Sequence, residues 1–431
     1  MTNRTEGGPT PGRTMTEKIL ERASGKPARP GDIVVCEIDS IVYLDQAFVT
    51  KTEPLPVRMD HPERVSIILD HSIPAPTIAD ADGQRLAREF AREFGIERLF
   101  DVGSQGGICH QVILEQGLVL PGQMLACSDS HTCACGVLNA AGRGLGRLEM
   151  TQVLCTGRTW FQVCPTIRYD LVGRPQPMVF GKDVFLYLAG RYGEHTNLNV
   201  EFGGAGVAGL GLDDRATIAT MCAELGAEFA VFPYDEVTAG HLARIGATDF
   251  EPALADEDAV YHDRRIVDLG SVSPMVALPE FVPNNTVPVA EVADQRIDQA
   301  FIGSCANGKL SDLATAAEVL RGRRVAAGVR LIVTPASQAV YLEAVRRGYV
   351  EILVEAGAVV TNSTCGACWG AHMGVLGGRE VCITSSTRNF RGRMGAADAQ
   401  IYIGSSATVA ASAVRGVLAD PRDFARRAVL R

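Results

Sequence analysis

The 431-residue sequence has no apolar run of the ~18–20 residues that a membrane-spanning helix needs, so we expect no membrane partner. Residues 1–15 are polar and lack the apolar core of a secretion signal, which predicts a flexible tail and a cytoplasmic protein. Positive charge is not in surplus either. Lys and Arg total 41 against 50 Asp and Glu, and the resulting net charge of −9 disfavours nucleic acid as a partner.

Two common catalytic signatures are also missing. The chain contains no G-x4-G-K-[ST] and no G-x-S-x-G, so nothing supports a P-loop ATPase or a serine hydrolase. Residues 204–209 match G-x-G-x-x-G, but no clear strand–turn–helix frame surrounds them and no ribose-binding acid follows. We therefore expect no dinucleotide site there.

Hydrophobic residues make up 46% of the chain and charged residues 21%, as in ordinary globular proteins. Strand-like and helix-like patterns alternate along it, which predicts an α/β fold with largely parallel sheets. The expected strands are 33–36 (read as buried), 99–102, 123–127, 166–172, 229–232, 299–302 and 329–333. The expected helices are 16–25, 84–94, 150–157, 182–192, 215–225, 310–320 and 337–347. Proline-rich stretches at 173–177 and 279–288 predict three domains, over residues 16–172, 173–288 and 289–431.

Twelve cysteines in a chain without a secretion signal favour metal binding or catalysis over a disulfide framework. Cys365 and Cys368 form a C-x2-C in a glycine-rich turn, and Cys305 follows a predicted strand, where free backbone N–H groups can stabilise a thiolate. His372 could complete a Cys₃His zinc site with these cysteines. The spacing alone leaves zinc and an iron–sulfur cluster open, with a redox pair less favoured. Isolated cysteines are read as buried core residues, namely Cys36, Cys155, Cys164, Cys222 and Cys382.

Acid–base candidates gather at predicted strand-to-loop junctions. They are Asp70-His71, His110, and the stretch Asp129-Ser130-His131. Because open α/β sheets bind ligands at the carboxyl ends of their strands, these pairs together predict a site. Downstream, Arg388 and Arg393 carry guanidinium groups that suit carboxylates.

These motifs occur in an order that resembles the aconitase family from about residue 16 to residue 421, and in particular its isopropylmalate dehydratase and homoaconitase type of large subunit. The resemblance implies an aconitase-like fold of three α/β/α domains packed around a central iron–sulfur site. It implies one [4Fe–4S] cluster per chain on Cys305, Cys365 and Cys368, with one iron left without a protein ligand. His372 would then be a neighbour of the cluster and not a ligand.

The same resemblance implies a hydro-lyase that dehydrates and rehydrates a 2-alkylmalate-type hydroxy diacid, with 3-isopropylmalate and leucine biosynthesis as the default. It implies catalytic roles for Asp70, His71, His110, Asp129, His131 and Glu224, and substrate binding by Arg388, Arg393, Asp45 and Ser130. It also implies a separate small subunit that supplies a swivelling fourth domain and a catalytic serine.

Four residues depart from the pattern of the family: Leu44, Thr220, Ala306 and Thr387. They are expected near the cluster or the substrate, where they could alter hydrogen bonds and substrate shape. One alternative is therefore a paralogue that acts on another alkylmalate or on a homoaconitate-type substrate. The other is a non-enzymatic cluster or zinc sensor, which the retained acid–base pairs disfavour.

Overall fold

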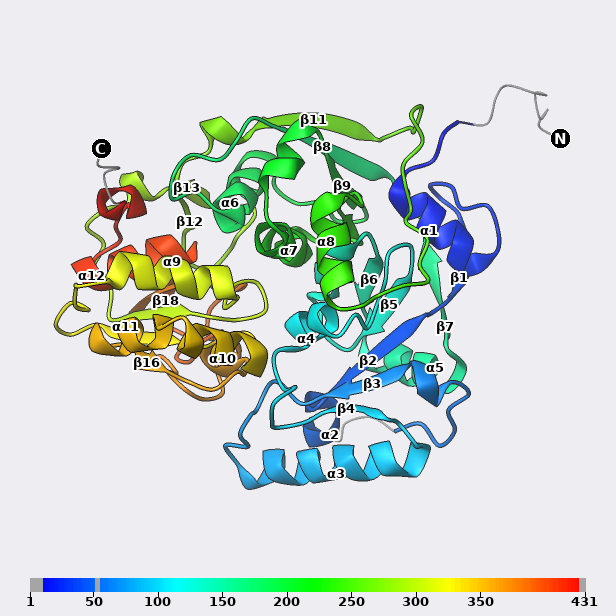
Figure 1. The fold of residues 1–431 in the computed structure, drawn as a ribbon, viewed down its shortest axis with the longest axis horizontal. Coiled ribbons are helices and arrows are strands. Elements are labelled where there is room, and N and C mark those ends of the chain that lie inside the picture. The colour runs from blue at the N-terminus through cyan, green and yellow to red at the C-terminus, as the bar shows by residue number, and fades with distance from the viewer. Residues whose placement is uncertain (1–10, 51–54, 426–431) are drawn as a thin grey trace.

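The computed structural model describes residues 11–50 and 55–425. Three larger sheets follow one another along the chain, with helices packed on them (Figure 1). A separate antiparallel ribbon joins β1 (Ile33–Glu37) to β7 (Arg158–Gln162). The α/β class predicted from the alternating pattern is confirmed.

The first sheet has five parallel strands in the order β4-β3-β2-β5-β6. They are β2 (Ser40–Leu44), β3 (Val65–Ile68), β4 (Arg98–Phe100), β5 (Met124–Cys127) and β6 (Ala141–Gly144). The helices of this part are α1 (Met15–Ser24), α2 (Gln46–Thr50), α3 (Ile78–Phe94), α4 (Cys109–Glu115) and α5 (Arg147–Thr156). The chain runs from β2 to β3 and β4, then returns to β5 on the other side of β2. The loops after β2 and β5 therefore diverge at a topological switch point, the usual ligand position in such sheets.

The second sheet has four parallel strands in the order β10-β9-β8-β11. They are β8 (Thr166–Val172), β9 (Asn199–Gly203), β10 (Ala230–Val231) and β11 (Asp263–Asp268). Its helices are α6 (Gly181–Tyr192), α7 (Leu212–Met221) and α8 (Glu236–Arg244). Figure 1 shows α7 and α8 between this sheet and the other two parts of the molecule.

The third sheet has seven strands in the order β13-β12-β18-β17-β14-β15-β16, and β12 pairs antiparallel with both of its neighbours. They are β12 (Met275–Ala277), β13 (Thr286–Pro288), β14 (Gln299–Ile302), β15 (Arg330–Val333), β16 (Val359–Val360), β17 (Val381–Thr384) and β18 (Gln400–Gly404). Its helices are α9 (Leu310–Leu320), α10 (Gln338–Arg346), α11 (Tyr349–Glu355) and α12 (Ser406–Arg415). The chain leaves β14 toward β15 and β16 and returns to β17 on the opposite side. A second switch point therefore lies between the loops that follow β14 and β17.

Helix α3 illustrates how local sequence sets these elements. The side chain of Thr77 accepts the N–H of Asp80 at the start of the helix, and Gly95 ends it with a left-handed backbone (φ 66°). Ala87, Phe90 and Ala91 repeat at the helical period and are buried. The predicted helix over 84–94 is confirmed and begins earlier than predicted, because Thr77 provides the cap.

Two interpretations of single motifs were wrong. A strand–turn–helix frame does surround residues 204–209, because β9 ends at Gly203 and α7 begins at Leu212 after a short 3-10 turn. Cys155, expected in the core, is only partly buried.

Two expectations at the N-terminal end also differ from the structure. The strand at 33–36 was expected to be buried, but it alternates, with Ile33 71% and Val35 60% exposed. The ribbon has only one covered face, which explains the alternation. The first ten residues of the expected flexible tail lie outside the described residues. The remainder of that tail is ordered, since Gly12 bridges to Ala259 and the backbone N–H of Arg13 donates to Asp256 at 2.8 Å.

The chain does not pass from one sheet to the next at the expected domain boundaries. Strand β8 pairs with β9 in the second sheet, and strands β12 and β13 belong to the third. The chain therefore enters the second sheet between β7 and β8 and the third sheet between β11 and β12. The domain limits of 172/173 and 288/289 stay predictions.

Candidate active site

Three acidic residues stand at the carboxyl edge of the first sheet. Asp45 directly follows β2, Asp70 lies two residues after β3, and Asp129 lies two residues after β5. The strands are parallel neighbours, so their carboxyl ends bring these side chains to one edge, at the switch point. The structure confirms the expected position of Asp70 and Asp129 at strand-to-loop junctions. The same expectation was wrong for His110, which lies in the first turn of α4.

His71 is held between two buried carboxylates. Its Nδ1 lies 2.6 Å from Asp70 Oδ1 and 3.6 Å from Asp45 Oδ1. Asp45 also accepts the backbone N–H groups of His71 and Ser72, at 3.3 and 3.2 Å. Burial would lower the pKa of His71, but the two carboxylates outweigh it and raise that pKa well above 6.5. Burial would likewise raise the pKa of Asp45, yet the hydrogen bond from His71 holds it below its usual value.

Asp129 is the centre of a histidine cluster. Its Oδ1 lies 2.8 Å from His110 Nε2 and 3.5 Å from His131 Nδ1, and its Oδ2 lies 3.7 Å from His71 Nε2. Although burial opposes ionisation, His110 and His131 together hold the pKa of Asp129 well below 3.8. Asp129 therefore stays ionised and links the three imidazoles through one carboxylate.

Glu224 and Arg388 extend this network into the other two parts of the molecule. Glu224, in the short turn after α7, accepts from His131 Nε2 and from Arg388 Nε, both at 2.8 Å. Arg388, after β17, also donates to Ser130 Oγ at 3.0 Å. In the Glu224–His131 pair, the hydrogen bonds and opposite charges outweigh burial. The pKa of Glu224 is therefore lowered and that of His131 is raised. One continuous polar network thus joins all three sheets.

The three candidate cysteines come from the third sheet. Cys305 follows β14 at the second switch point, and Cys365 and Cys368 lie in the loop after β16. Burial raises the pKa of the Cys305 and Cys365 thiols well above 9. The pKa of Cys368 is lowered against burial, because the Arg393 guanidinium lies 3.9 Å from its sulfur.

The loop that carries Cys365 is clamped onto the first sheet. The N–H of Cys365 donates to Asp70 O at 3.0 Å, and Thr364 Oγ1 donates to the same carbonyl at 2.9 Å. Asn362 Nδ2 donates to Ile73 O at 2.7 Å. As a result, Asp70, His71 and Cys365 bring potential ligand atoms within 4.8 Å of one another. The cysteines and the acid–base pairs, which are far apart in sequence, therefore form one site.

The donor set can be tested against a single zinc ion. Four ligands around zinc at about 2.3 Å would place sulfurs about 3.8 Å apart. Within residues 11–50 and 55–425, Cys305, Cys365 and Cys368 do not meet a 4.8 Å limit as a group. His372 does not join them, because its Nε2 lies 2.9 Å from the carbonyl oxygen of His71. The wider spacing suits a polynuclear cluster better than a Cys₃His ion.

Unpartnered polar atoms surround the cysteines. Thr387 Oγ1, Ser386 Oγ, Arg393 Nε and Trp369 Nε1 are buried without a hydrogen-bond partner in the structure. A native protein rarely buries such groups unsatisfied. Three of them belong to the segment between Ser386 and Arg393, after β17, and they suit a group with acceptor atoms beside the thiols. The residues present therefore fit an anionic sulfur-rich cofactor.

The residues that depart from the pattern of the family lie close to this site, with different consequences. The hydroxyl of Thr220 is engaged by Ala216 O at 2.6 Å, so it cannot reach outward. The hydroxyl of Thr387 is free to reach the site. Leu44 contributes only its N–H, which donates to Ser128 Oγ at 3.1 Å, and Ala306 is fully buried.

The sequence alone did not identify two lysines that lie behind the cysteine loops. Lys182 is fully buried at the start of α6, and Lys309, 2% exposed, precedes α9. Burial lowers the pKa of Lys182 to about 7, while Cys305, Asp312 and Cys368 counteract that fall. Nothing in the local sequence marks these lysines as interior residues, and only their three-dimensional surroundings do so.

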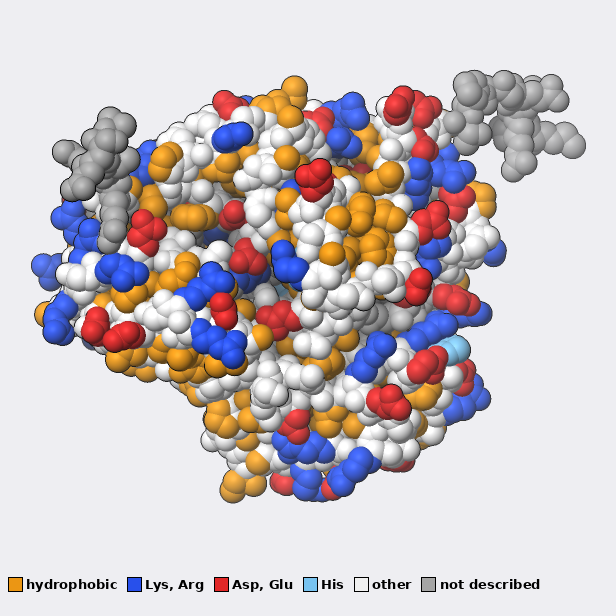
Figure 2. All heavy atoms as spheres, viewed as in Figure 1, with side chains coloured by type: hydrophobic (Ala, Val, Ile, Leu, Met, Phe, Trp, Pro, Cys, Tyr) orange, Lys and Arg blue, Asp and Glu red, His pale blue; other side chains and the backbone are white. Residues whose placement is uncertain are grey.

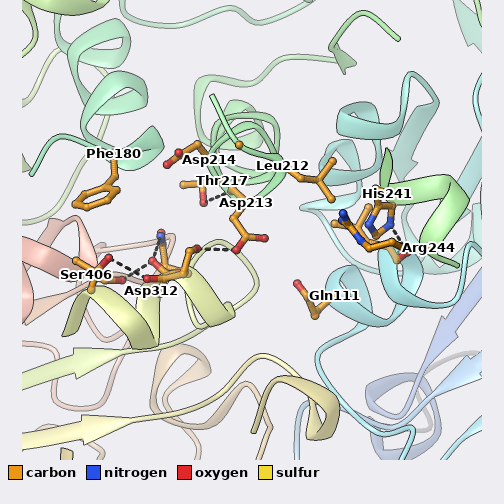
Figure 3. A pocket seen from close by; sticks show the side chains of 15 residues that line it. Gln111, Phe180, Leu212, Asp213, Asp214, Thr217, His241, Arg244, Asp312 and Ser406 are labelled. Atoms are coloured by element: carbon orange, nitrogen blue, oxygen red, sulfur yellow. Dashed lines mark hydrogen bonds between the residues drawn. The ribbon is translucent and has the colours of Figure 1, made fainter. Parts of the chain in front are cut away.

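A cavity of about 390 Å³ lies apart from the cysteines, between α4, α7, α8 and α9 (Figure 3). Its carboxylates mainly serve the backbone. Asp214 accepts the N–H of Gly181 at the start of α6, and Asp312 accepts those of Gly308 and Lys309 before α9. The acidic lining is thereby explained by helix ends. A second cavity, of about 340 Å³, adjoins the site itself through Ser130 and Arg388.

Two further observations bear on partners. None of the helices in the described ranges is both long and apolar enough to cross a membrane. On the face shown in Figure 2, acidic and basic side chains are interspersed, with no continuous basic patch. This face therefore lacks the electrostatic footprint of a nucleic-acid-binding surface.

The fold and the site define an α/β protein in which three sheets meet at one polar site with three cysteines, and comparisons with known proteins name its family. The model of the aconitase family (aconitate hydratase) matches residues 42–295 and 288–416, so the chain belongs to the aconitase family. The structure resembles aconitase X of Thermococcus kodakaraensis in fold, with a TM-score of 0.50 and 15% identity over 85% of this chain and 88% of that one. That likeness agrees with the aconitase-like fold expected from the motifs.

Three relatives are more similar in sequence. The 3-isopropylmalate dehydratase large subunit of Mycolicibacterium smegmatis is 56% identical over 412 residues, covering 95% of this chain and 97% of the relative. The large subunit 1 of Methanopyrus kandleri, with the same enzyme name, is 42% identical over 96% of this chain and all of its own. A probable methanogen homoaconitase large subunit of Methanothermobacter thermautotrophicus is 40% identical over 95% of this chain and 98% of its own.

Proposed function

We propose that this chain is the large subunit of a hydro-lyase that dehydrates and rehydrates a 2-alkylmalate-type hydroxy diacid, with 3-isopropylmalate as its substrate. The observation that carries the proposal is the network around Asp129, which brings histidines, an arginine and the three cysteines into one site. The 56% identity to a relative of that name supports the choice of substrate. We keep the cytoplasm as the expected location.

The histidines and carboxylates are proposed to move and hold protons. Asp129, kept ionised by two imidazoles, orients His110 Nε2 and His131 Nδ1. His71, kept protonated between Asp70 and Asp45, can donate a proton from Nε2 to the departing hydroxyl. Positioned proton transfer of this kind contributes about 10²–10⁴-fold in rate.

The cationic side chains are proposed to hold the diacid. Arg388, tied to Glu224 and Ser130, and Arg393, beside Cys368, offer guanidinium groups from the loop after β17. Bidentate arginine–carboxylate pairing fixes both position and orientation. Ser130, at the rim of the adjoining cavity, can hydrogen-bond the same carboxylate.

Cys305, Cys365 and Cys368 are proposed to hold one [4Fe–4S] cluster with one iron free of protein ligands. Bound there, the cluster would supply Lewis acidity for the loss of the substrate hydroxyl, which is otherwise a poor leaving group. The thiols, the neighbouring unpartnered polar atoms and the membership of the aconitase family all support this assignment.

A small subunit is proposed as partner. The relatives at 56% and 42% identity are both named large subunits, and they match this chain over nearly their whole length. Among the described residues, the site holds no serine placed as a general base with a histidine partner. We therefore expect the small subunit to bring a serine base, and the large subunit alone to be inactive.

The first test is metal content. Protein purified without oxygen should contain about four irons and four sulfides per chain and negligible zinc. Stoichiometric zinc without sulfide, persisting after anaerobic reconstitution, would support the zinc-sensor alternative and overturn the proposal.

The second test is a substrate panel with the cognate small subunit. The chain should turn over 3-isopropylmalate faster than homoaconitate-type or other alkylmalate diacids. A clear preference for another diacid would identify the specialised paralogue, whose candidate cause is the group of departures at Leu44, Thr220, Ala306 and Thr387. Turnover of none of them, by a chain that holds the cluster, would overturn the enzymatic proposal.

A further inference from the structure

Two buried lysines lie behind the loops that carry the cysteines. Lys182 is fully buried and Lys309 is 2% exposed. Across residues 11–50 and 55–425, neither ammonium forms an ion pair with a carboxylate within 4.0 Å. Burying a charge without a counterion costs several kcal/mol, so proteins normally pair such groups. The two lysines therefore lack a direct ion pair, although the carboxylate of Asp312 interacts electrostatically with Lys182 and that of Asp214 with Lys309.

Their hydrogen bonds fix the two loops of the second switch point. Lys309 Nζ donates to the carbonyl oxygens of Cys305, at 3.5 Å, and of Ala306. Lys182 Nζ donates to Ser386 O at 3.0 Å, in the segment that leads to Arg388. Carbonyl dipoles satisfy the donors but do not neutralise the charge. Since Lys182 comes from the second sheet, it also ties that part of the molecule to the cysteine loops.

Besides the carboxylates of Asp312 and Asp214, the thiols of the candidate ligands are the groups around the lysines that can become anions. Cys305 interacts electrostatically with both lysines, and Cys368 interacts with Lys182. A cubane of four irons held by three thiolates carries net negative charge, as do the thiolates themselves. Such a group would add negative charge close to both ammonium groups at once, where no carboxylate forms a direct ion pair.

We propose that Lys182 and Lys309 form a cation pair that stabilises the negative charge of the thiolate-bound cluster and raises its reduction potential. They act as positioning and charge-balancing residues, without contact with the substrate. This inference rests on the cluster assigned above. It predicts that each lysine opposes folding of the cofactor-free chain and favours the cofactor-loaded one.

The test uses the full-length chain, prepared anaerobically, with Lys182→Met and Lys309→Met, which keep the side-chain volume and remove the charge. Lys182→Arg and Lys309→Arg retain the charge, and Lys18→Met on the surface is the control, because Lys18 pairs with Asp256 far from the site. The midpoint potential of the cluster is measured by reductive titration followed by electron paramagnetic resonance. The thermal midpoint of the cofactor-free chain is measured in parallel.

Each Met variant should shift the one-electron reduction equilibrium about tenfold toward the oxidised cluster, which corresponds to a fall of 59 mV. Its cofactor-free form should unfold at the same temperature as wild type or higher. The Arg variants and Lys18→Met should keep the wild-type potential. Folded Met variants that fail to take up the cluster, while the Arg variants take it up, would support the same conclusion.

Other outcomes overturn the inference. Unchanged midpoint potentials in both Met variants would show that the lysines are uncharged, or that their charge does not reach the cluster. A lowered thermal midpoint of the cofactor-free Met variants, or a failure to fold, would assign the lysines an ordinary structural role. Equal loss of the cluster in Met and Arg variants would point to packing and not to charge. If the wild type itself holds no cluster, it is the proposed function that fails, which the metal analysis shows separately.

Discussion

Glu224→Gln is the most informative single substitution in the site. Glu224 joins His131 of the first part to Arg388 of the third, and Arg388 has one further hydrogen bond to that part, to Ser130 Oγ. Its carboxylate accepts from His131 and from Arg388, both at 2.8 Å, and its side chain is 13% exposed. The substitution keeps the shape of the side chain and removes the charge that both cations share.

The expected loss follows from these two bonds. A hydrogen bond to a charged group contributes about 1.5–3 kcal/mol, so two give about 3–6 kcal/mol. Arg388 is 25% exposed, and solvent screens its share. The amide oxygen of glutamine also retains one acceptor. We therefore expect Glu224→Gln to lower the free energy of unfolding around the site by about 3 kcal/mol.

The loss should depend on pH in a defined way. The folded pKa of His131 is raised, so its contribution to stability is complete below pH 6.5 and disappears as the pH rises through the raised value. The folded pKa of Glu224 is lowered, so its contribution is complete above pH 4.5 and disappears as the pH falls through the lowered value. The effect of Glu224→Gln should therefore be greatest between pH 4.5 and 6.5.

Trp369 provides a local probe for this measurement. The chain has two tryptophans, and Trp369 stacks edge-on against His71 at a ring separation of 5.5 Å. In a Trp160→Phe background, urea unfolding of the cofactor-free chain is followed by the fluorescence of Trp369. Glu115→Gln is the matched control, because Glu115 is a partly buried acid whose partners, Ser337 and Gln111, are neutral.

Burial raises the pKa of Glu115, so Glu115→Gln should leave stability near neutral pH unchanged or higher. A loss below about 1 kcal/mol for Glu224→Gln at pH 5.5 would refute the shared-carboxylate reasoning. So would a loss of constant size from pH 5 to pH 9, because the charge of His131 would then contribute nothing.

The remaining predictions concern the cofactor, the substrate and acid stability. Cys305→Ser should lose iron and sulfide on anaerobic purification, whereas Cys382→Ser, at a buried site away from the cluster, should keep both; iron retained by Cys305→Ser would exclude it as a ligand. Arg393→Lys should raise KM for the diacid at least tenfold, or about 1.4 kcal/mol, in steady-state kinetics with the small subunit, and an unchanged KM would remove it from the substrate site. The ionised Asp129 stabilises the wild-type chain, and this contribution is lost as the pH falls through its lowered pKa. Asp129→Asn should lack the contribution, so its stability should fall less on acidification than that of wild type. Identical acid unfolding curves would contradict this.

Much of the fold could be predicted from local patterns. Helices with a clear apolar period and a cap, such as α3 and α6, occur where they were expected. Short strands in uniformly buried runs, such as β2 and β3, show no alternation and were missed. The ribbon strand β1 was identified but placed in the interior, since four apolar residues in a row do not reveal that one face is open.

The site was predictable to a different degree. Motif order marked the cysteines and the acid–base pairs, whereas their spacing left zinc and a cluster equally open. The resemblance to the family already implied that His372 is not a ligand, and the structure adds its contact with the carbonyl of His71. The lysines could not be foreseen, because burial of Lys182 and Lys309 depends on how the second and third sheets meet. Sequence patterns report neighbours along the chain, and these contacts are between distant segments.

The clamp between the Cys365 loop and residues 70–73 has a consequence for the order of maturation. The loop is anchored by hydrogen bonds to Asp70 and Ile73, and Lys182 anchors the facing segment from another direction. A nascent chain that stops before residue 365 contains the histidine cluster but only Cys305 of the three candidate ligand cysteines. The site can therefore be completed only after the third part of the chain has been made and the Cys365 loop has docked against residues 70–73.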